Sequence, residues 1–242
     1  MSMARSFAGS AFLVSLFATV PASWAACPPA RGVAVSFVPA ARDLQIDGGP
    51  AVRLSGVSAG LALAVHGPFR LIMIDQRPDR WGRVAGLVIP ADQQGESLNA
   101  TLIRQGVSPA ITPDLPVDCV PVFLAAEAEA RAARRGVWAQ GGLATAAADL
   151  DRLRQREGQF TLVSGRVSSV RRGRQRLYLN FGAFGSERFS VNVAVSRLPA
   201  FEAAGLDLAA LKGQEIEVRG TIGPGLAMEL TVPAALVKLR RS

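Results

Sequence analysis

Short runs of alternating hydrophobic and polar residues fill the first part of the chain, and this period of two is typical of β-strands. The runs that we expect to form strands are residues 33–38, 44–46, 52–57, 69–75 and 84–89. Turn sequences separate them, among them Asp47-Gly48-Gly49-Pro50 and His66-Gly67-Pro68. The spacing therefore predicts five short strands that close on one another through tight turns.

Two segments with helical spacing follow these strands, at about 96–105 and 122–135. Glu127 and Arg131 are four residues apart, so we expect them to form a weak ion pair on the solvent face of the second helix. Ala133 is expected to face inward with the other small residues of that helix. Five strands and two helices predict a mainly β fold with α (α+β), a small closed barrel with packed helices.

The composition changes at residues 140–157, where a small, uncharged stretch from Gly141 to Ala148 precedes a short charged helix at 149–156. Strand patterns then resume at 160–170, 175–181 and 188–195, followed by a helical stretch at 198–211. Two final strands are expected at 215–222 and 228–237. Three strands, a helix and two strands is the order of an OB-type barrel. We therefore predict a first domain at 31–139, a linker with a short helix at 140–157, and an OB-type domain at 158–239.

The amino terminus has the pattern of an export signal. Arg5 precedes an apolar run at 7–20, and Ser23-Trp24-Ala25 supplies small residues for cleavage. A membrane anchor is the alternative, but the run is shorter than the roughly 20 residues that a bilayer requires. Residues 1–25 thus predict a cleaved signal peptide, no transmembrane segment after cleavage, and a periplasmic or extracellular location.

The chain has two cysteines, Cys27 and Cys119. In an oxidising compartment such a pair favours a disulfide. The alternative is lipid attachment at Cys27, but Trp24 stands where an aliphatic residue is usual, and lipidation would leave Cys119 without a partner. The prediction is a disulfide.

The formal net charge is +8, and Lys212 and Lys238 are the only lysines, so nearly all the positive charge is arginine. A planar guanidinium binds phosphate in a bidentate manner, so the arginines suit a phosphate ligand. The alternative is a biased nucleotide composition of the genome, which replaces lysine by arginine throughout the protein. Five arginines crowd one predicted hairpin of the second domain, followed closely by Tyr178: Arg166, Arg171, Arg172, Arg174 and Arg176. The last four, with Tyr178, are the predicted ligand-binding residues.

Arginines interleaved with aromatic rings suit single-stranded nucleic acid, because charges follow the backbone and rings stack on bases. The period of two places Tyr178 and Asn180 on one face of their strand and Leu177, Leu179 and Phe181 on the other. Phe181 is therefore expected in the core, while Phe184 and Phe189 follow nearby. The alternative is a solvated basic turn on a barrel whose aromatic rings are all inside.

Four sequence motifs carry a family resemblance: VRLSGVSA at 52–59, DRWGRVAGLV at 79–88, ESLNATLIRQGVSPA at 96–110 and AEAEARAARRGVW at 126–138. In order and spacing they resemble the staphylococcal-nuclease-like (thermonuclease) family over about 33–138. The resemblance implies an OB-like five-stranded barrel with packed helices. The segment from LYLNFG onward is similar to a C-terminal module of bacterial thermonuclease-like proteins.

The resemblance implies that Arg53 and Arg83 occupy the two positions that bind the scissile phosphate. Ser58 stands where a metal-binding aspartate is expected, and Leu61 where the general base is expected. The acidic run of the family reads Ala-Ala-Arg-Asp at 40–43, so carboxylates appear deficient beside these arginines. Calcium prefers six to eight oxygen ligands, several of them anionic.

These departures predict a non-catalytic protein without a cofactor, which binds nucleic acid or another polyanion through its arginines. One alternative is an active calcium-dependent nuclease, in which Asp43 reaches a ligand position through a bulge. The other is a structural or partner-binding envelope protein. His66 is the only histidine and completes no metal site, and Trp81 is expected to pack under its turn.

Overall fold

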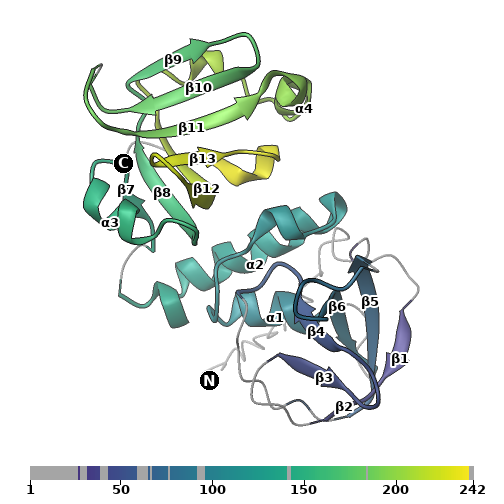
Figure 1. Cartoon of the computed structure of the whole chain (residues 1–242). Coiled ribbons are helices and arrows are strands. Elements are labelled where there is room, and N and C mark those ends of the chain that lie inside the picture. The colour runs from purple at the N-terminus through teal and green to yellow at the C-terminus, as the bar shows by residue number, and fades with distance from the viewer. Residues whose placement is uncertain are drawn as a thin grey trace, which may run out of the picture.

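The computed structural model describes residues 27, 32–38, 43–58, 65, 67–75, 77–91, 96–140, 143–183 and 185–239. The fold is mainly β with α, as predicted, and consists of two sheets with separate cores (Figure 1). The predicted signal peptide and the expectations for residues 40–42, Leu61, His66 and Phe184 lie outside the described residues. Among the helices that are described, none has the length and apolar character to span a bilayer.

The first sheet forms a closed circuit. It contains β1 (Val33–Val35), β2 (Phe37–Val38), β3 (Leu44–Ile46), β4 (Ala51–Leu54), β5 (Phe69–Asp75) and β6 (Val84–Pro90). Their order is β1-β5-β6-β4-β3-β2, in which only β4 and β6 run parallel. Because Ser36 alone separates β1 from β2, the two edges of the sheet belong to one interrupted strand, and the sheet closes into a barrel.

Helix α1 (Leu98–Arg104) is joined to this barrel by one buried side chain. The Asn99 amide donates to the carbonyl oxygens of Ser55 (2.9 Å) and Gly86 (3.0 Å), and its oxygen accepts from the Val88 amide (3.0 Å). Ser97 caps the start of the helix by accepting from the Ala100 amide. Asn99 thus satisfies backbone groups near the ends of β4 and β6, and holds β4, which carries Arg53, beside β6, which Arg83 directly precedes.

Helix α2 (Val120–Ala132) packs Phe123, Ala126 and Ala130 inward. It ends three residues before the predicted end, and Ala133 is exposed rather than buried. The predicted disulfide between Cys27 and Cys119 is confirmed, and Cys119 directly precedes the helix. The two cysteines are 92 residues apart, so the crosslink encloses the whole first barrel.

The second sheet closes in the same way. Its strands and helices are β7 (Thr145–Ala146), α3 (Leu150–Gln155), β8 (Phe160–Arg166), β9 (Ser169–Arg172), β10 (Arg176–Phe181), β11 (Phe189–Ala194), α4 (Leu198–Ala203), β12 (Glu215–Gly223), β13 (Ala227–Glu229) and β14 (Leu236–Lys238). The order is β7-β8-β12-β13-β11-β10-β9, with β14 beside β12. Only Val167 and Ser168 separate β8 from β9, so these two act as one bent strand that closes the barrel.

The two barrels have the same strand connectivity. In each, the bent first strand pairs with the second and the fourth, and the third strand runs parallel to the fifth. The predicted order of three strands, a helix and two strands is thus present in the second barrel, with β7 added. The last strand, predicted at 228–237, is divided into β13 and β14 by a 3-10 turn at Pro233–Ala235. Strand β7 and helix α3 fall within the stretch predicted as a linker, and Ala147 and Leu153 contribute to the second core. The domain limits at 31–139, 140–157 and 158–239 remain predictions.

Four charged side chains join the barrels, two from α2 and two from β12. Arg219 donates to both carboxylate oxygens of Glu127, at 2.9 and 3.0 Å, and Arg131 donates to both oxygens of Glu217, at 3.1 and 2.7 Å. Arg131 also pairs with Glu127, and Arg219 with Glu217. We call Glu127, Arg131, Glu217 and Arg219 the interface quartet.

The interface quartet is largely hidden from water, with side-chain exposures of 3% for Glu127 and Arg219 and 7% for Glu217. The predicted pair of Glu127 and Arg131 is present, and Arg131 is 33% exposed. The expectation that Glu127 lies on the solvent face is wrong, because β12 covers it. Burial raises the pKa of Glu127, but Arg219, Arg131 and the Ala110 amide outweigh it and hold that pKa below its ordinary value. The arginines thus keep Glu127 ionised in a buried position.

Candidate functional site

Arg53 lies on β4 of the first barrel, and Arg83 directly precedes β6, the strand that runs parallel to β4. The register pairs Val52 of β4 with Val84 of β6, and both valines point into the core. Arg53 follows Val52 and Arg83 precedes Val84, so both arginines point to the face opposite the core. The turn after β4 requires Gly56, which has φ of +78° and lies against Leu115, where a Cβ atom would come within 2.6 Å. The motif residues thus bring the two arginines to one face, as the resemblance implies.

Both guanidinium groups form ion pairs with carboxylates. Arg53 Nη1 lies 2.5 Å from Asp114 Oδ2, and Arg83 contacts Asp79 at 2.8 Å and Asp43 at 3.1 Å. The expected deficit of carboxylates beside these arginines is therefore wrong. Asp114 comes from a short 3-10 turn 61 residues beyond Arg53, and Asp43 adopts a left-handed backbone conformation with φ of +58°. Neither contact could be seen by matching the local motifs.

The pKa of Arg83 and that of Asp79 shift in the directions expected of an ion pair. Hydrogen bonding to Asp79 raises the pKa of Arg83, partial burial opposes this, and Asp43 adds to the increase. For Asp79, desolvation raises the pKa, but the bonds from Arg83 outweigh it and the pKa is lowered. Three carboxylates thus face two guanidiniums, so this face carries no excess positive charge for an incoming phosphate.

Calcium does not fit the residues on this face. The Ser58 hydroxyl lies 2.9 Å from the Ser108 hydroxyl, and its amide donates to the same oxygen at 3.0 Å, so the position of the expected metal ligand belongs to a neutral hydroxyl pair. In the part of the chain that the structure describes, no three His, Cys, Asp or Glu side chains form a group that could hold a metal ion. The three aspartates present are paired with arginines instead.

An open groove of about 520 Å³ runs beside Arg53, and its lining is mostly apolar, with Met73, Leu115 and Pro116 among its residues. Trp81 is 63% exposed, so the expectation that it packs under its turn is wrong. The guanidinium carbon atoms of Arg80 and Arg83 lie 3.9 and 4.8 Å from the centre of the Trp81 ring. The turn is held by the Asp79 carboxylate, which accepts from the Trp81 and Arg83 amides, so the ring is not needed to support it.

The outer face of β9, β10 and β11 in the second barrel is different. Two rows of side chains cross it, as the strand register requires. The first row contains Arg171, Tyr178 and Asn192, and the second contains Ser169, Asn180 and Ser190. The alternation predicted for β10 is confirmed, since Leu177, Leu179 and Phe181 all lie in the core.

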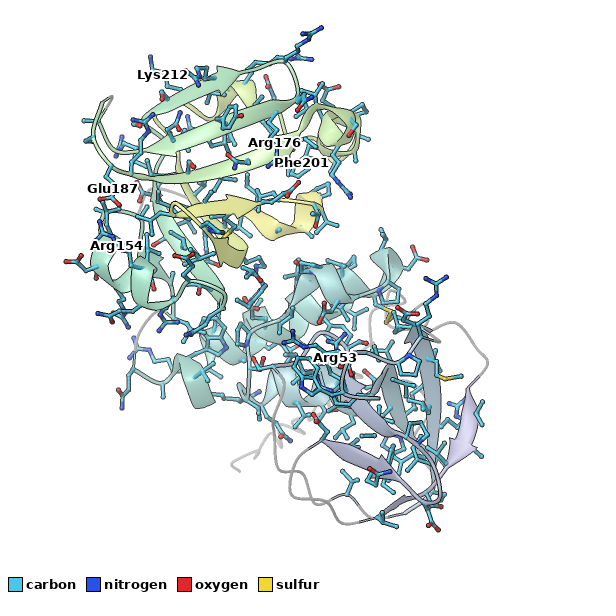
Figure 2. The ribbon with its side chains drawn as sticks, viewed as in Figure 1. Arg53, Arg154, Arg176, Glu187, Phe201 and Lys212 are labelled. Atoms are coloured by element: carbon cyan, nitrogen blue, oxygen red, sulfur yellow. A yellow bond between two sulfur atoms is a disulfide. The ribbon has the colours of Figure 1, made fainter. Side chains whose placement is uncertain are left out.

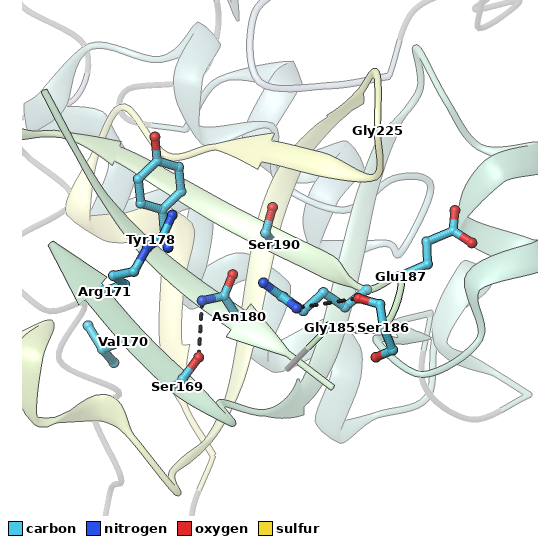
Figure 3. A pocket seen from close by; sticks show the side chains of 11 residues that line it. Ser169, Val170, Arg171, Tyr178, Asn180, Gly185, Ser186, Glu187, Ser190 and Gly225 are labelled. Carbon is cyan, nitrogen blue, oxygen red and sulfur yellow. Dashed lines mark hydrogen bonds between the residues drawn. The ribbon is translucent and has the colours of Figure 1, made fainter. Parts of the chain in front are cut away.

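A pocket of about 690 Å³ lies over these rows (Figure 3). Tyr178 and Arg171 stand at one end, with the guanidinium carbon 5.8 Å from the ring centre. Ser169, Asn180 and Ser190 form the middle of the floor, where the Asn180 amide donates to the Ser169 hydroxyl at 3.1 Å. Among the described residues, Arg171 has no carboxylate within ion-pair distance, unlike Arg53 and Arg83.

The loop between β10 and β11 closes the other end of this pocket. Arg188 lines it and donates to the carbonyl oxygens of Ala183 (3.1 Å) and Ser186 (3.3 Å). Glu187 also lines it, but its carboxylate pairs with Arg154 of α3 (Figure 2). The pocket therefore keeps a positive balance. The sequence reasoning missed Ser190 and Arg188, although the alternation along β11 places Ser190 on the face of Tyr178.

The other arginines predicted for this site are placed differently. Arg172 is opposite Leu177 in the register, so it points away from the face of Tyr178, and Arg174 lies in the exposed turn between β9 and β10. Arg176 shares the face of Tyr178 but lies 3.9 Å from Glu229. The structure thus brings together Arg171 and Tyr178, keeps Arg176 nearby, and leaves Arg172 and Arg174 outside the pocket.

The candidate faces of the two barrels do not form one groove. The pocket lies over β9–β11, whereas the interface quartet attaches the second barrel through β12, on the other side of the strand circuit (Figure 1). Arg53 lies within the first barrel, well apart from Glu187 at the edge of the pocket (Figure 2). Each face must therefore act by itself.

Comparisons with known proteins match a part of the chain that includes β5, β6, α1 and α2. Residues 63–140 match the family model described as staphylococcal nuclease homologue, so the amino-terminal part contains a staphylococcal-nuclease-like domain. No curated protein matches the chain. One solved structure, described as an aspartyl-tRNA synthetase from Leishmania major Friedlin, is similar at 18% identity and a TM-score of 0.29. The match covers 40% of this chain and 21% of that one, and at this score it supports no argument about function.

Proposed function

We propose that this protein is an exported, non-catalytic binding protein that holds single-stranded nucleic acid on the outer face of β9, β10 and β11. The observation that carries the proposal is the pairing of Arg171 with Tyr178 in an open pocket, where the guanidinium is not neutralised by a described carboxylate. A base can stack on the ring while the arginine contacts the adjoining phosphate. Arg188 supplies a second cation at the far end.

The geometry of the first barrel supports the non-catalytic part of the proposal. To act on a phosphodiester, Arg83 would have to exchange two carboxylates for a phosphate, and a base would have to activate water. The positions of the expected base and metal ligand are Leu61 and Ser58. The first barrel accordingly serves to support the second, through the buried interface quartet.

Binding is tested with a fluorescein-labelled single-stranded oligonucleotide, by fluorescence anisotropy at several salt concentrations. We expect the affinity to fall steeply with salt. Tyr178→Leu, which removes the ring but keeps an apolar side chain, should weaken binding about 5- to 150-fold, the value of one stacked base. A salt-independent interaction, or none, contradicts the proposal.

The matched control for the pocket arginine is its neighbour on the same strand. Arg171→Gln should weaken binding and lower the salt dependence, whereas Arg172→Gln, which removes the same charge on the opposite face, should leave both nearly unchanged. Equal losses in the two variants would show that only the overall charge matters. Thermal unfolding of each variant establishes that the barrel is intact.

An active nuclease is the second candidate, because Asp43 and Asp79 do lie beside Arg83. It requires that one of them leave the arginine and bind calcium. Incubation of the mature protein with DNA and calcium, beside an Arg83→Ala control, decides between the two: cleavage that disappears in the control would establish the nuclease. Capture of an envelope protein without any nucleic-acid binding would favour the partner-binding alternative.

A further inference from the structure

The floor of the second-barrel pocket offers hydroxyl and amide groups in the position where the sugar of a bound strand would lie. We infer that the site prefers single-stranded RNA to single-stranded DNA, because these groups can recognise the ribose 2′-hydroxyl. This inference rests on the proposed function, since it names the nucleic acid that the same pocket takes.

The strand register orders the contacts along the pocket. On β9, Arg171 lies two residues from Ser169. Arg188, in the loop just before β11, lies two residues from Ser190, on the opposite side of the same row. Two residues along a strand span about 7 Å. The row of Ser169, Asn180 and Ser190 thus lies between two arginines, one at each end of the pocket.

This sequence of groups matches the chemistry of a ribonucleotide chain. The Arg171 guanidinium suits a phosphate, and the tyrosine ring beside it suits a base. The hydroxyls of the serines can both donate to and accept from a 2′-hydroxyl. In DNA the same floor would face a carbon-bound hydrogen, and its polar groups would lose water without gaining a partner.

Only Tyr178 supplies an aromatic surface among the residues that line the pocket and are described. Stacking therefore accounts for one base, and hydrogen bonds to the sugar and charge contacts must supply the rest of the interaction. Stacking alone would not distinguish RNA from DNA, because both present the same ring faces. The discrimination is thus assigned to the serine and asparagine row.

The test compares three labelled oligomers of one length: uridine, deoxyuridine and 2′-O-methyluridine. The unmodified RNA should bind about five- to tenfold more tightly than the other two, as one or two net hydrogen bonds allow. Ser190→Ala should reduce RNA affinity by most of that factor and leave DNA affinity unchanged. Thr221→Ala, at an exposed position of β12 away from the pocket, is the matched control and should change neither.

Each other result overturns the inference in a recognisable way. Equal affinity for uridine and deoxyuridine oligomers would remove the RNA preference and leave the proposed nucleic-acid binding intact. Failure of all three oligomers to bind would remove the proposed function as well. If an acidic polysaccharide displaces the RNA more effectively than unlabelled RNA does, the floor recognises sugars of another polymer. A loss in Ser190→Ala that is equal for RNA and DNA would assign the serine to the pocket shape alone.

Discussion

The two barrels have the same strand circuit but distribute their charges differently. On the first, Arg53 and Arg83 are held by three aspartates, and Arg53 borders a mostly apolar groove. On the second, Arg171 stands beside Tyr178 over a polar pocket, with no described carboxylate in ion-pair range. The comparison teaches that the family position of an arginine does not decide whether its charge is balanced, because the carboxylates that balance it come from other segments of the chain.

The barrels also differ in how they are stabilised. The first is enclosed by the disulfide between Cys27 and Cys119, whereas the second contains no cysteine. The interface quartet then joins the disulfide-bonded barrel to the other through α2. This division of roles predicts that changes in the first barrel affect stability, while changes in the pocket of the second affect binding.

The largest effect is expected from removal of the disulfide. In the double variant Cys27→Ala and Cys119→Ala, the free energy of unfolding should fall by about 4–5 kcal/mol, because a loop of 92 residues is no longer closed in the unfolded chain. Urea unfolding of the variant beside the oxidised protein measures this. A loss below about 1 kcal/mol would show that the first barrel does not depend on its crosslink.

The interface quartet should come next. Arg219→Met leaves Glu127 without the guanidinium that binds both its oxygens, and breaking a buried ion pair in this way costs about 3–5 kcal/mol. Urea unfolding followed by tryptophan fluorescence reports it, since Trp138 is buried and stacks with Arg131 at 4.1 Å. The control Arg152→Met removes an exposed arginine and should change stability by less than about 0.5 kcal/mol. Equal behaviour of the two variants would contradict the role of the quartet.

The quartet also predicts a dependence of stability on pH. Because the folded protein holds the pKa of Glu127 below its ordinary value, ionised Glu127 stabilises the fold above that value, about 4.3. This contribution should be lost as the pH falls from there through the lowered pKa, where the carboxylate becomes protonated. Melting temperatures measured from pH 7 to pH 3 should therefore fall less steeply in Glu127→Gln than in the unmodified protein. Parallel curves would assign the acid sensitivity to other groups.

The smallest effect is expected for the first-barrel arginines. Arg53→Gln and Arg83→Gln should each change the affinity for single-stranded nucleic acid by less than about twofold, because aspartates already neutralise both side chains. Anisotropy titrations beside Arg171→Gln make the comparison direct. A loss in Arg83→Gln as large as that in Arg171→Gln would show that the first barrel shares in binding.

Much of the fold followed from local pattern. Strands β3 and β5 begin and end at the predicted residues. The alternation along β10 correctly predicted that Tyr178 lies on the face opposite the core residues Leu177, Leu179 and Phe181. The bends at Ser36 and at Val167–Ser168 were missed, because an interruption of one or two residues hardly alters a period of two. These bends matter, since they allow each first strand to pair on both sides and close its barrel.

What the sequence determined by itself is which face of each element turns toward its own core, because a side-chain period is a local property of the chain. What only the tertiary structure decided is which element covers the opposite face. Glu127 and Arg219 are 92 residues apart, and each looks solvent-exposed in its own helix or strand. Asp114 and Arg53 likewise meet across 61 residues. Charge pairing over such separations depends on how whole elements pack, so the periodicity of side chains within one element cannot predict it.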